Sequence, residues 1–203
     1  MDLTPAQQDA LKELLNIGFG RAAASLSQLT GHRVLLDVPA VAIHPLGELK
    51  DALADLLTDD VASVQQIFSG PVAGDALLVI NHQAAGILKQ LLTDEPALPL
   101  HLDASAREVL TEIGNILLNA CLGTFGNLLD VQVSFSIPHL NLDTLHGILQ
   151  SLLVKREDLR CGLLVHAGFR LRDAEVTGYL VIVLSVASLD RLIRAVETWE
   201  QDQ

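Results

Sequence analysis

The sequence is poor in aromatic residues and in cysteine. Aromatic side chains make up 3% of the 203 residues, which leaves little with which to stack nucleic-acid bases. The two cysteines, Cys121 and Cys161, are too few for the disulfide framework of a small secreted domain, and no CxxC pair indicates a zinc or redox site. We therefore expect a core built from Leu, Val, Ile and Ala.

Positive charge and long apolar runs are also scarce. The chain has 13 Lys and Arg against 25 Asp and Glu, a net charge of −12. Such a surface repels phosphate backbones and anionic lipids, so we expect neither nucleic acid nor membrane as a partner. The longest apolar run, residues 178–184, is far shorter than the ~18 residues of a membrane-spanning helix. Residues 1–5 lack the features of a signal peptide, and together these absences predict a cytoplasmic globular protein.

A pattern in the first half of the chain returns 99 residues later. Residues 13–17 (ELLNI) align with residues 112–116 (EIGNI), and in each half a strand-like run ends at a proline 23 positions after the asparagine, at Pro39 and at Pro138. We therefore predict one domain, residues 1–203, made of two repeats (about 1–95 and 100–203).

Further signals give the order of elements in each repeat: long helix, strand, short helix, two strands, helix. The boundary between the repeats falls at residues 94–99, whose two prolines indicate a linker. Thr4 and Gln7 form a capping box before the first long helix, and Gly31 ends it. Apolar stripes at helical spacing run from Leu11 to Leu29 and from Leu110 to Leu128.

These elements predict an α/β (α+β) fold with a pseudo-two-fold internal repeat. In this fold two long helices pack against a shared, largely antiparallel sheet, and we expect helices to cover only one face of that sheet. Small residues in the first long helix, Gly18 and Ala22 among them, let another helix approach closely.

Each long helix carries two acidic residues and an asparagine away from its apolar stripe. They are spaced at i, i+4 and i+7, which places them within about 60° of one helix face. The residues are Asp9, Glu13 and Asn16 in the first helix and Glu108, Glu112 and Asn115 in the second. A solvated face would explain one such set. Two sets at the same phase, each with a weak helix former at the same place, favour a functional interpretation.

The pattern Asp/Ser-x3-Glu-x2-Asn-x22-Pro is that of the CheC family of chemotaxis phosphatases (the CheC, CheX and FliY type). The chain resembles this family over essentially its full length. Its first copy fits completely, whereas the second has Glu108 where the family usually has Asp or Ser. The segment at residues 68–70 (FSG) and the one at 178–180 (GYL) are also similar to the family's.

The resemblance implies hydrolysis of the aspartyl phosphate of a CheY-like response regulator. It implies that Asn16 and Asn115 position the attacking water and that Glu13 and Glu112 contact the receiver's active-site lysine. The catalytic residues would then be these four, with Asp9, Glu108, Pro39 and Pro138 in supporting roles. The Mg²⁺ would belong to the phosphorylated receiver, because this sequence has no metal-binding spacing of its own. A CheD-like deamidase is a further possible partner.

Two interpretations of Glu108 stay open. Residues 105–108 (SARE) match a capping box, in which Glu108 reaches back to the start of the helix. If so, the second site is slower or unused; the alternative hypothesis is that both sites work and the Asn16 site dominates.

Other motifs carry less weight. Residues 18–23 (GFGRAA) match a dinucleotide-binding pattern, but they lie inside a predicted helix and not between a strand and a helix. Cys121 lies on the apolar stripe and Cys161 in a predicted strand, so neither is expected to be a nucleophile. The rival to a phosphatase is a non-catalytic scaffold that binds a receiver, a CheD-like deamidase or flagellar switch components.

Overall fold

The computed structural model describes residues 3–38, 40–54, 57, 60–93, 103–128, 130–155, 160–171 and 174–201. The first half contains α1 (Pro5–Thr30), β1 (Val34–Asp37), β2 (Val41–Pro45), η1 (Leu46–Glu48), α2 (Leu49–Ala54), β3 (Asp60–Ser69), β4 (Gly74–Asn81) and α3 (His82–Thr93). The second half contains α4 (Ala104–Leu128), β5 (Ser134–Phe135), β6 (His139–Thr144), α5 (Leu145–Lys155), β7 (Cys161–Leu171), β8 (Ala174–Leu184) and α6 (Val186–Gln201).

All eight described strands form one antiparallel sheet. The strand order is β1-β7-β8-β4-β3-β5, with β2 also pairing with β7 and β6 with β3. The mixed fold with two long helices on a shared antiparallel sheet is therefore confirmed. Where the sequence predicted one strand after each long helix, the structure has two short ones.

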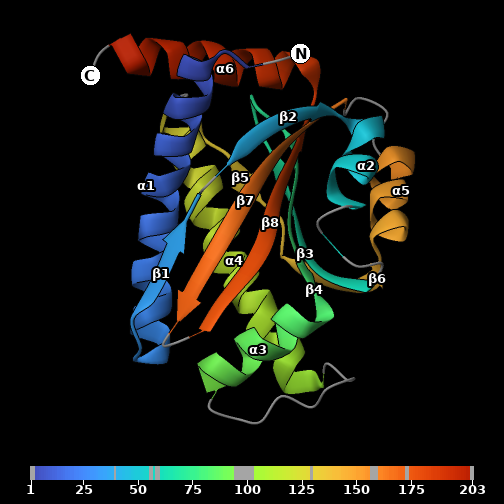
Figure 1. Ribbon diagram of the computed structural model, residues 1–203. Coiled ribbons are helices and arrows are strands. Elements are labelled where there is room, and N and C mark those ends of the chain that lie inside the picture. Colours follow the sequence, from blue (N-terminus) through green and yellow to red (C-terminus); the bar gives the residue numbers. More distant parts are fainter. Residues whose placement is uncertain are drawn as a thin grey trace.

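The centre of the sheet is buried on both faces. On one face Leu78 and Leu180 belong to a core formed with α1, α4, α3 and α6; on the other, Leu77 and Val181 belong to a second core formed with α2 and α5. Figure 1 shows α1 on one side of the sheet and the short helices α2 and α5 on the other. The expectation of a single helix-covered face was wrong, because these short helices cover the second face and explain the continuous apolar runs in β4 and β8.

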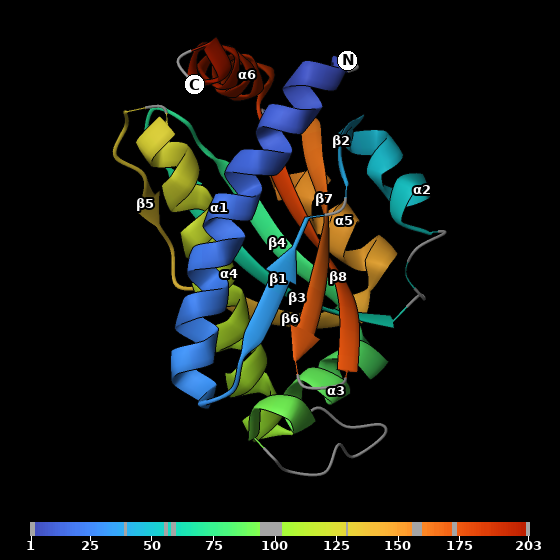
Figure 2. The ribbon, with the colours of Figure 1, turned by 60° about the vertical axis from the view of Figure 1, so that its left-hand side comes forward.

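The two long helices, α1 and α4, lie side by side and run in opposite directions (Figure 2). They approach closely at Gly18, where a Cβ atom would lie 3.1 Å from the Cα of Cys121. Gly18, the first glycine of the dinucleotide-like pattern, is therefore a helix-packing residue. Helix α6 lies across one end of the pair and α3 at the other end (Figure 1).

The ends of α1 follow the sequence signals. The Thr4 side chain accepts a hydrogen bond from the Gln7 N–H, the Gln7 side chain accepts one from the Thr4 N–H, and Gly31 ends the helix with φ 68°. The apolar stripe, however, ends one turn early, since Leu26 is buried whereas Leu29 is 62% exposed.

By length and composition α4 is the one helix in the described part of the chain that could cross a membrane. In this structure, 56% of the apolar 18-residue stretch of α4 is buried inside the protein, as expected of a core helix.

The strand register pairs corresponding residues of the two halves in a similar way. Leu36 pairs with Phe169 in the way that Phe135 pairs with Phe68. The short strands in these pairs are offset by 99 residues and the long ones by 101. The proposed boundary at residues 94–99 lies outside the described residues, and the internal repeat remains a prediction.

Replacing Gly114 by alanine should destabilise the protein, because the new Cβ would overlap the β-branched side chain of Val64. Overpacking of this kind costs about 1–3 kcal/mol. Gly123→Ala in the same helix is the matched control: nothing lies within 4 Å of the added atom, so it should stabilise by up to about 1 kcal/mol. Chemical denaturation measures both, and equal effects of the two variants would contradict the packing described here.

Candidate functional site

The first candidate face lies on α1 and consists of Asp9, Glu13 and Asn16, all of them exposed. The helix puts the three on one side, as their spacing predicts. The side-chain oxygen of Asn16 (Oδ1) accepts a hydrogen bond from the main-chain N–H of Val38, with 3.1 Å between the heavy atoms. Because a main-chain N–H can only donate, this bond fixes the amide with its oxygen inward and its NH₂ group free to meet a partner.

Val38 explains part of the spacing of the motif. It is the residue before Pro39, and it is 1% exposed. A residue that precedes a proline is held in an extended conformation, which favours one direction for its N–H. Pro39 itself lies outside the described residues, and its supporting role stays a prediction.

The second candidate face lies on α4 and consists of Glu108, Glu112 and Asn115. The two carboxylates are exposed and Asn115 is half-buried. Here Asn115 Oδ1 accepts a hydrogen bond from the side-chain NH₂ of Asn119, one turn further along the helix, at 2.7 Å. Both asparagines therefore have an anchored oxygen, but the donors differ in kind.

The loop beside the second face is arranged differently from the loop beside the first. The counterpart of Val38 is Ile137, which is 79% exposed and makes no described hydrogen bond to Asn115. Ser136 instead bonds to β3, both through its N–H to the Ile67 carbonyl and through its hydroxyl to the Ile67 N–H. Pro138 follows this loop, is half-buried, and does not bring a main-chain donor to Asn115.

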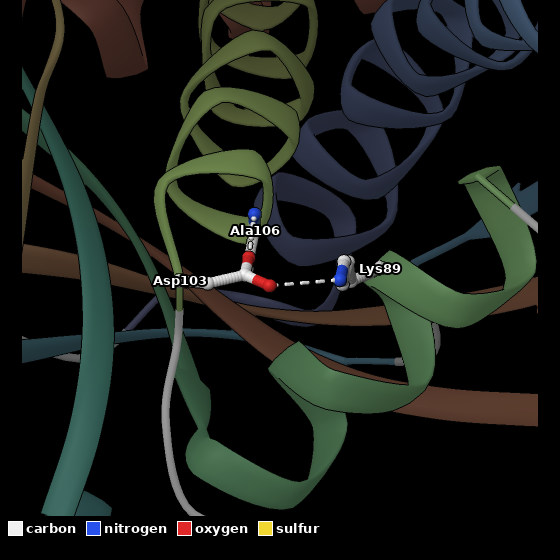
Figure 3. Close-up of polar contacts among 3 residues, drawn as sticks. All are labelled: Lys89, Asp103 and Ala106. Atoms are coloured by element: carbon white, nitrogen blue, oxygen red, sulfur yellow. Dashed lines mark hydrogen bonds and ion pairs between the residues drawn. The ribbon is translucent and has the colours of Figure 1, made fainter. Parts of the chain in front are cut away.

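The capping-box interpretation of Glu108 was wrong. Helix α4 begins at Ala104, and its N-cap is Asp103, whose carboxylate accepts a hydrogen bond from the Ala106 N–H at 2.8 Å. Ser105 lies inside the first turn. The other carboxylate oxygen of Asp103 pairs with Lys89 of α3 at 3.1 Å (Figure 3), so the cap also ties α4 to α3. Glu108 is thus an exposed member of the second face.

The two faces do not form one site. Each asparagine lies in the N-terminal half of its helix, and the helices run in opposite directions, so the faces lie toward opposite ends of the helix pair (Figure 2). Sequence reasoning predicted the six face residues but missed Val38 and Asn119, which hold the two amides. Proximity to a proline and spacing at i+4 were the signals that could have indicated them.

Other candidate chemistry in the chain is weak. No group of three or more His, Cys, Asp or Glu in the described residues could hold a metal ion. Burial raises the pKa of the Cys121 thiol strongly, which makes it a poor nucleophile and agrees with its place in the core. Cys161 pairs with Leu184 in the sheet, as a strand residue.

Comparison with known proteins shows a likeness to one family. The CheC-like family model matches residues 7–43, the stretch that holds the first face. A relative described as the CheY-P phosphatase CheC, from Bacillus subtilis, is 28% identical over 154 residues, which are 73% of this chain and 72% of CheC. Over this stretch the chain is similar to the CheC-like family.

Other similar proteins include a flagellar motor switch phosphatase. The flagellar motor switch phosphatase FliY of Bacillus subtilis is 24% identical over 148 residues, 70% of this chain but only 37% of FliY. The fold matches the crystal structure of Thermotoga maritima FliY with a TM-score of 0.78 at 17% identity, covering 98% of this chain and 99% of that one. It also matches the FliM middle domain of H. pylori, with a TM-score of 0.65 at 14% identity over 95% of this chain and 99% of that one.

The cap of α4 should make stability depend on acid pH. The Ala106 N–H and then Lys89 hold the pKa of Asp103 below its ordinary value of 3.8. The ionised carboxylate therefore stabilises the fold above that value, and this stabilisation is lost as pH falls through the lower folded-state pKa. Asp103→Asn should lower the Tm at pH 6, and the gap to wild type should narrow below about pH 4. Asp51→Asn, on α2, is the control for loss of one negative charge. A gap that widens in acid would contradict this role of Asp103.

Proposed function

We propose that this chain hydrolyses the aspartyl phosphate of a CheY-like response regulator in a chemotaxis or related two-component pathway. The observation that carries the proposal is the Asn16 amide, exposed on α1 beside two carboxylates and held in one orientation by the Val38 N–H. The family supports a chemotaxis protein, and the name of the relative CheC supports the phosphatase.

The chemistry suits an asparagine. An acyl phosphate is already reactive, so its hydrolysis needs a water held in line and charge stabilised around it more than it needs covalent help. An amide offers donors on nitrogen and an acceptor on oxygen. With Oδ1 anchored, Asn16 presents its NH₂ group and one remaining oxygen lone pair, and an orientation fixed before the partner binds lowers the cost of placing the water.

The carboxylates would orient the receiver. Glu13 and Glu112 are exposed and form no ion pair with any described residue, so each is available to a cation on a partner. The lysine of a receiver's active site is such a cation, and pairing with it would place the asparagine at the phosphoryl group. Asp9 and Glu108, one turn earlier on the same faces, would extend this contact.

We assign the Mg²⁺ to the receiver, where it would neutralise charge on the phosphoryl oxygens. A receiver is a cytoplasmic protein, so the proposal includes a cytoplasmic location for this chain. A CheD-like deamidase is a second partner that the resemblance suggests.

The alternative is a non-catalytic adaptor that docks receivers or flagellar switch components. It is favoured by the likeness of the fold to FliY and to the FliM middle domain. An adaptor, however, has no need of an asparagine fixed on an exposed acidic face, and this chain has one on each long helix.

Phosphate release from Mg²⁺-loaded, phosphorylated receivers of the same organism tests the proposal. Wild type should accelerate release, and the Asn16→Ala/Asn115→Ala double variant should lose about a hundredfold or more of that acceleration, as when a key transition-state donor is removed. Of the single variants, Asn16→Ala should lose more. Asn127→Ala, an exposed asparagine on α4, is the matched control and should keep full activity.

Two results would overturn parts of this account. Comparable losses in the two single variants would remove the dominance of the Asn16 site. Receiver binding without any acceleration by wild type would replace the phosphatase with the adaptor.

The role of Glu13 is separable from that of Asn16. In an Asn115→Ala background, Glu13→Gln should raise KM several-fold and leave kcat nearly unchanged, because it removes a contact made before and during the reaction alike. The effect should shrink as salt screens the pairing. A fall in kcat at unchanged KM would instead give Glu13 a part in the chemical step.

A further inference from the structure

The two asparagines are anchored by different donors. Asn16 bonds to a main-chain N–H, which lies in one fixed direction, whereas Asn115 bonds to the side chain of Asn119. The residue of α1 that corresponds to Asn119 is Gly20, which has no side chain to offer. The second half thus replaces a loop contact by a contact within its own helix.

The Asn119 side chain forms hydrogen bonds with no other described group. It is half-buried on α4, and its own Oδ1 is fully buried with no hydrogen-bond partner in the described part of the chain. Its single side-chain hydrogen bond in that part is the one it donates to Asn115, at 2.7 Å. A buried amide that leaves one end unsatisfied is unfavourable for stability, which points to a role outside folding.

We propose that Asn119 is a positioning residue, which holds the amide of Asn115 with its oxygen inward and its NH₂ group outward. In the second half it takes the place that the main-chain N–H of Val38 has in the first. The proposal rests on the proposed function and deepens it, because it assigns the group that prepares the second face.

The replacement has a consequence for the two sites. The Val38 N–H can only donate, so the amide of Asn16 has one favourable orientation. Asn119 can donate or accept. If both amides turn over, Asn115 donates to Asn119, the number of hydrogen bonds between them is unchanged, and Asn115 presents its oxygen outward. The Asn115 amide is therefore less firmly fixed, which gives a physical reason for a slower second site.

Side-chain amide spectra of the uniformly ¹⁵N-labelled wild-type chain test the orientation without any need for catalysis. The NH₂ proton that Asn119 donates to Asn115 should exchange slowly with solvent, and both NH₂ protons of Asn115 should exchange fast, because neither of these is hydrogen-bonded in the described part of the chain. Slow exchange at Asn115 with fast exchange at Asn119 would show the reverse arrangement and overturn the proposal.

Kinetics in the Asn16→Ala background test the role, since all remaining turnover then comes from the second face. Asn119→Ala should lower kcat by about five- to tenfold, the effect of one lost hydrogen bond, with KM unchanged. Asn119→Asp should lower kcat further, because a carboxylate only accepts and turns the Asn115 amide over. Asn127→Ala is again the matched control.

A purely structural residue would behave differently. Both Asn119 variants would then lower the Tm and leave kcat of the folded fraction unchanged, which would overturn the proposal. If wild type shows no phosphatase activity, the proposed function fails, and the exchange rates of the two amides still decide whether Asn119 orients Asn115.

Discussion

The close approach of α1 and α4 is the constraint on which the rest of the structure depends. Gly18 lies against the main chain of Cys121, and a side chain there would push the helices apart. Because the helices run in opposite directions, their N-terminal halves, which carry the two acidic faces, lie toward opposite ends of the pair. The two acidic faces, each with its asparagine, are a product of this packing.

The sheet holds this arrangement rigid. Its central strands are buried on both sides, against the long helices on one face and against α2 and α5 on the other. The long helices therefore pack against a sheet that is also supported from its other face. What varies between the halves is the loop after each long helix: Val38 is buried and bonds to Asn16, whereas Ile137 is exposed and the loop is tied to β3 through Ser136.

Local signals predicted local structure well. The capping box at Thr4, the left-handed Gly31 and the phase of the two polar faces all follow from spacings within one helix, and the structure has them. Predictions failed where a distant partner decides the outcome. Ser105 and Glu108 match a cap, yet α4 is capped by Asp103, which also pairs with Lys89 of α3.

The candidate site shows the same division. Its exposed residues were predicted from their spacing and from a family pattern, and their catalytic roles remain a proposal. The groups that orient the amides were missed for different reasons. Val38 contacts Asn16 only because the chain turns back along α1 after the helix ends. A contact across 22 residues of sequence cannot be predicted from the spacing of residues within a helix. Asn119 lies one turn from Asn115, but an asparagine at i+4 is common on a helix surface. Only the structure shows that Asn119 bonds to Asn115 and that its own oxygen is buried without a partner in the described residues.

Hydrogen exchange of the backbone amides, measured with and without a receiver activated by beryllofluoride, tests the central claim most directly. That claim is that the two long helices present two receiver-binding faces. The account predicts slowed exchange on binding around residues 9–16 of α1 and 108–115 of α4, with the stronger effect on α1. Slowed exchange confined to α2, α5 or the edge strands, with both faces unchanged, would contradict it.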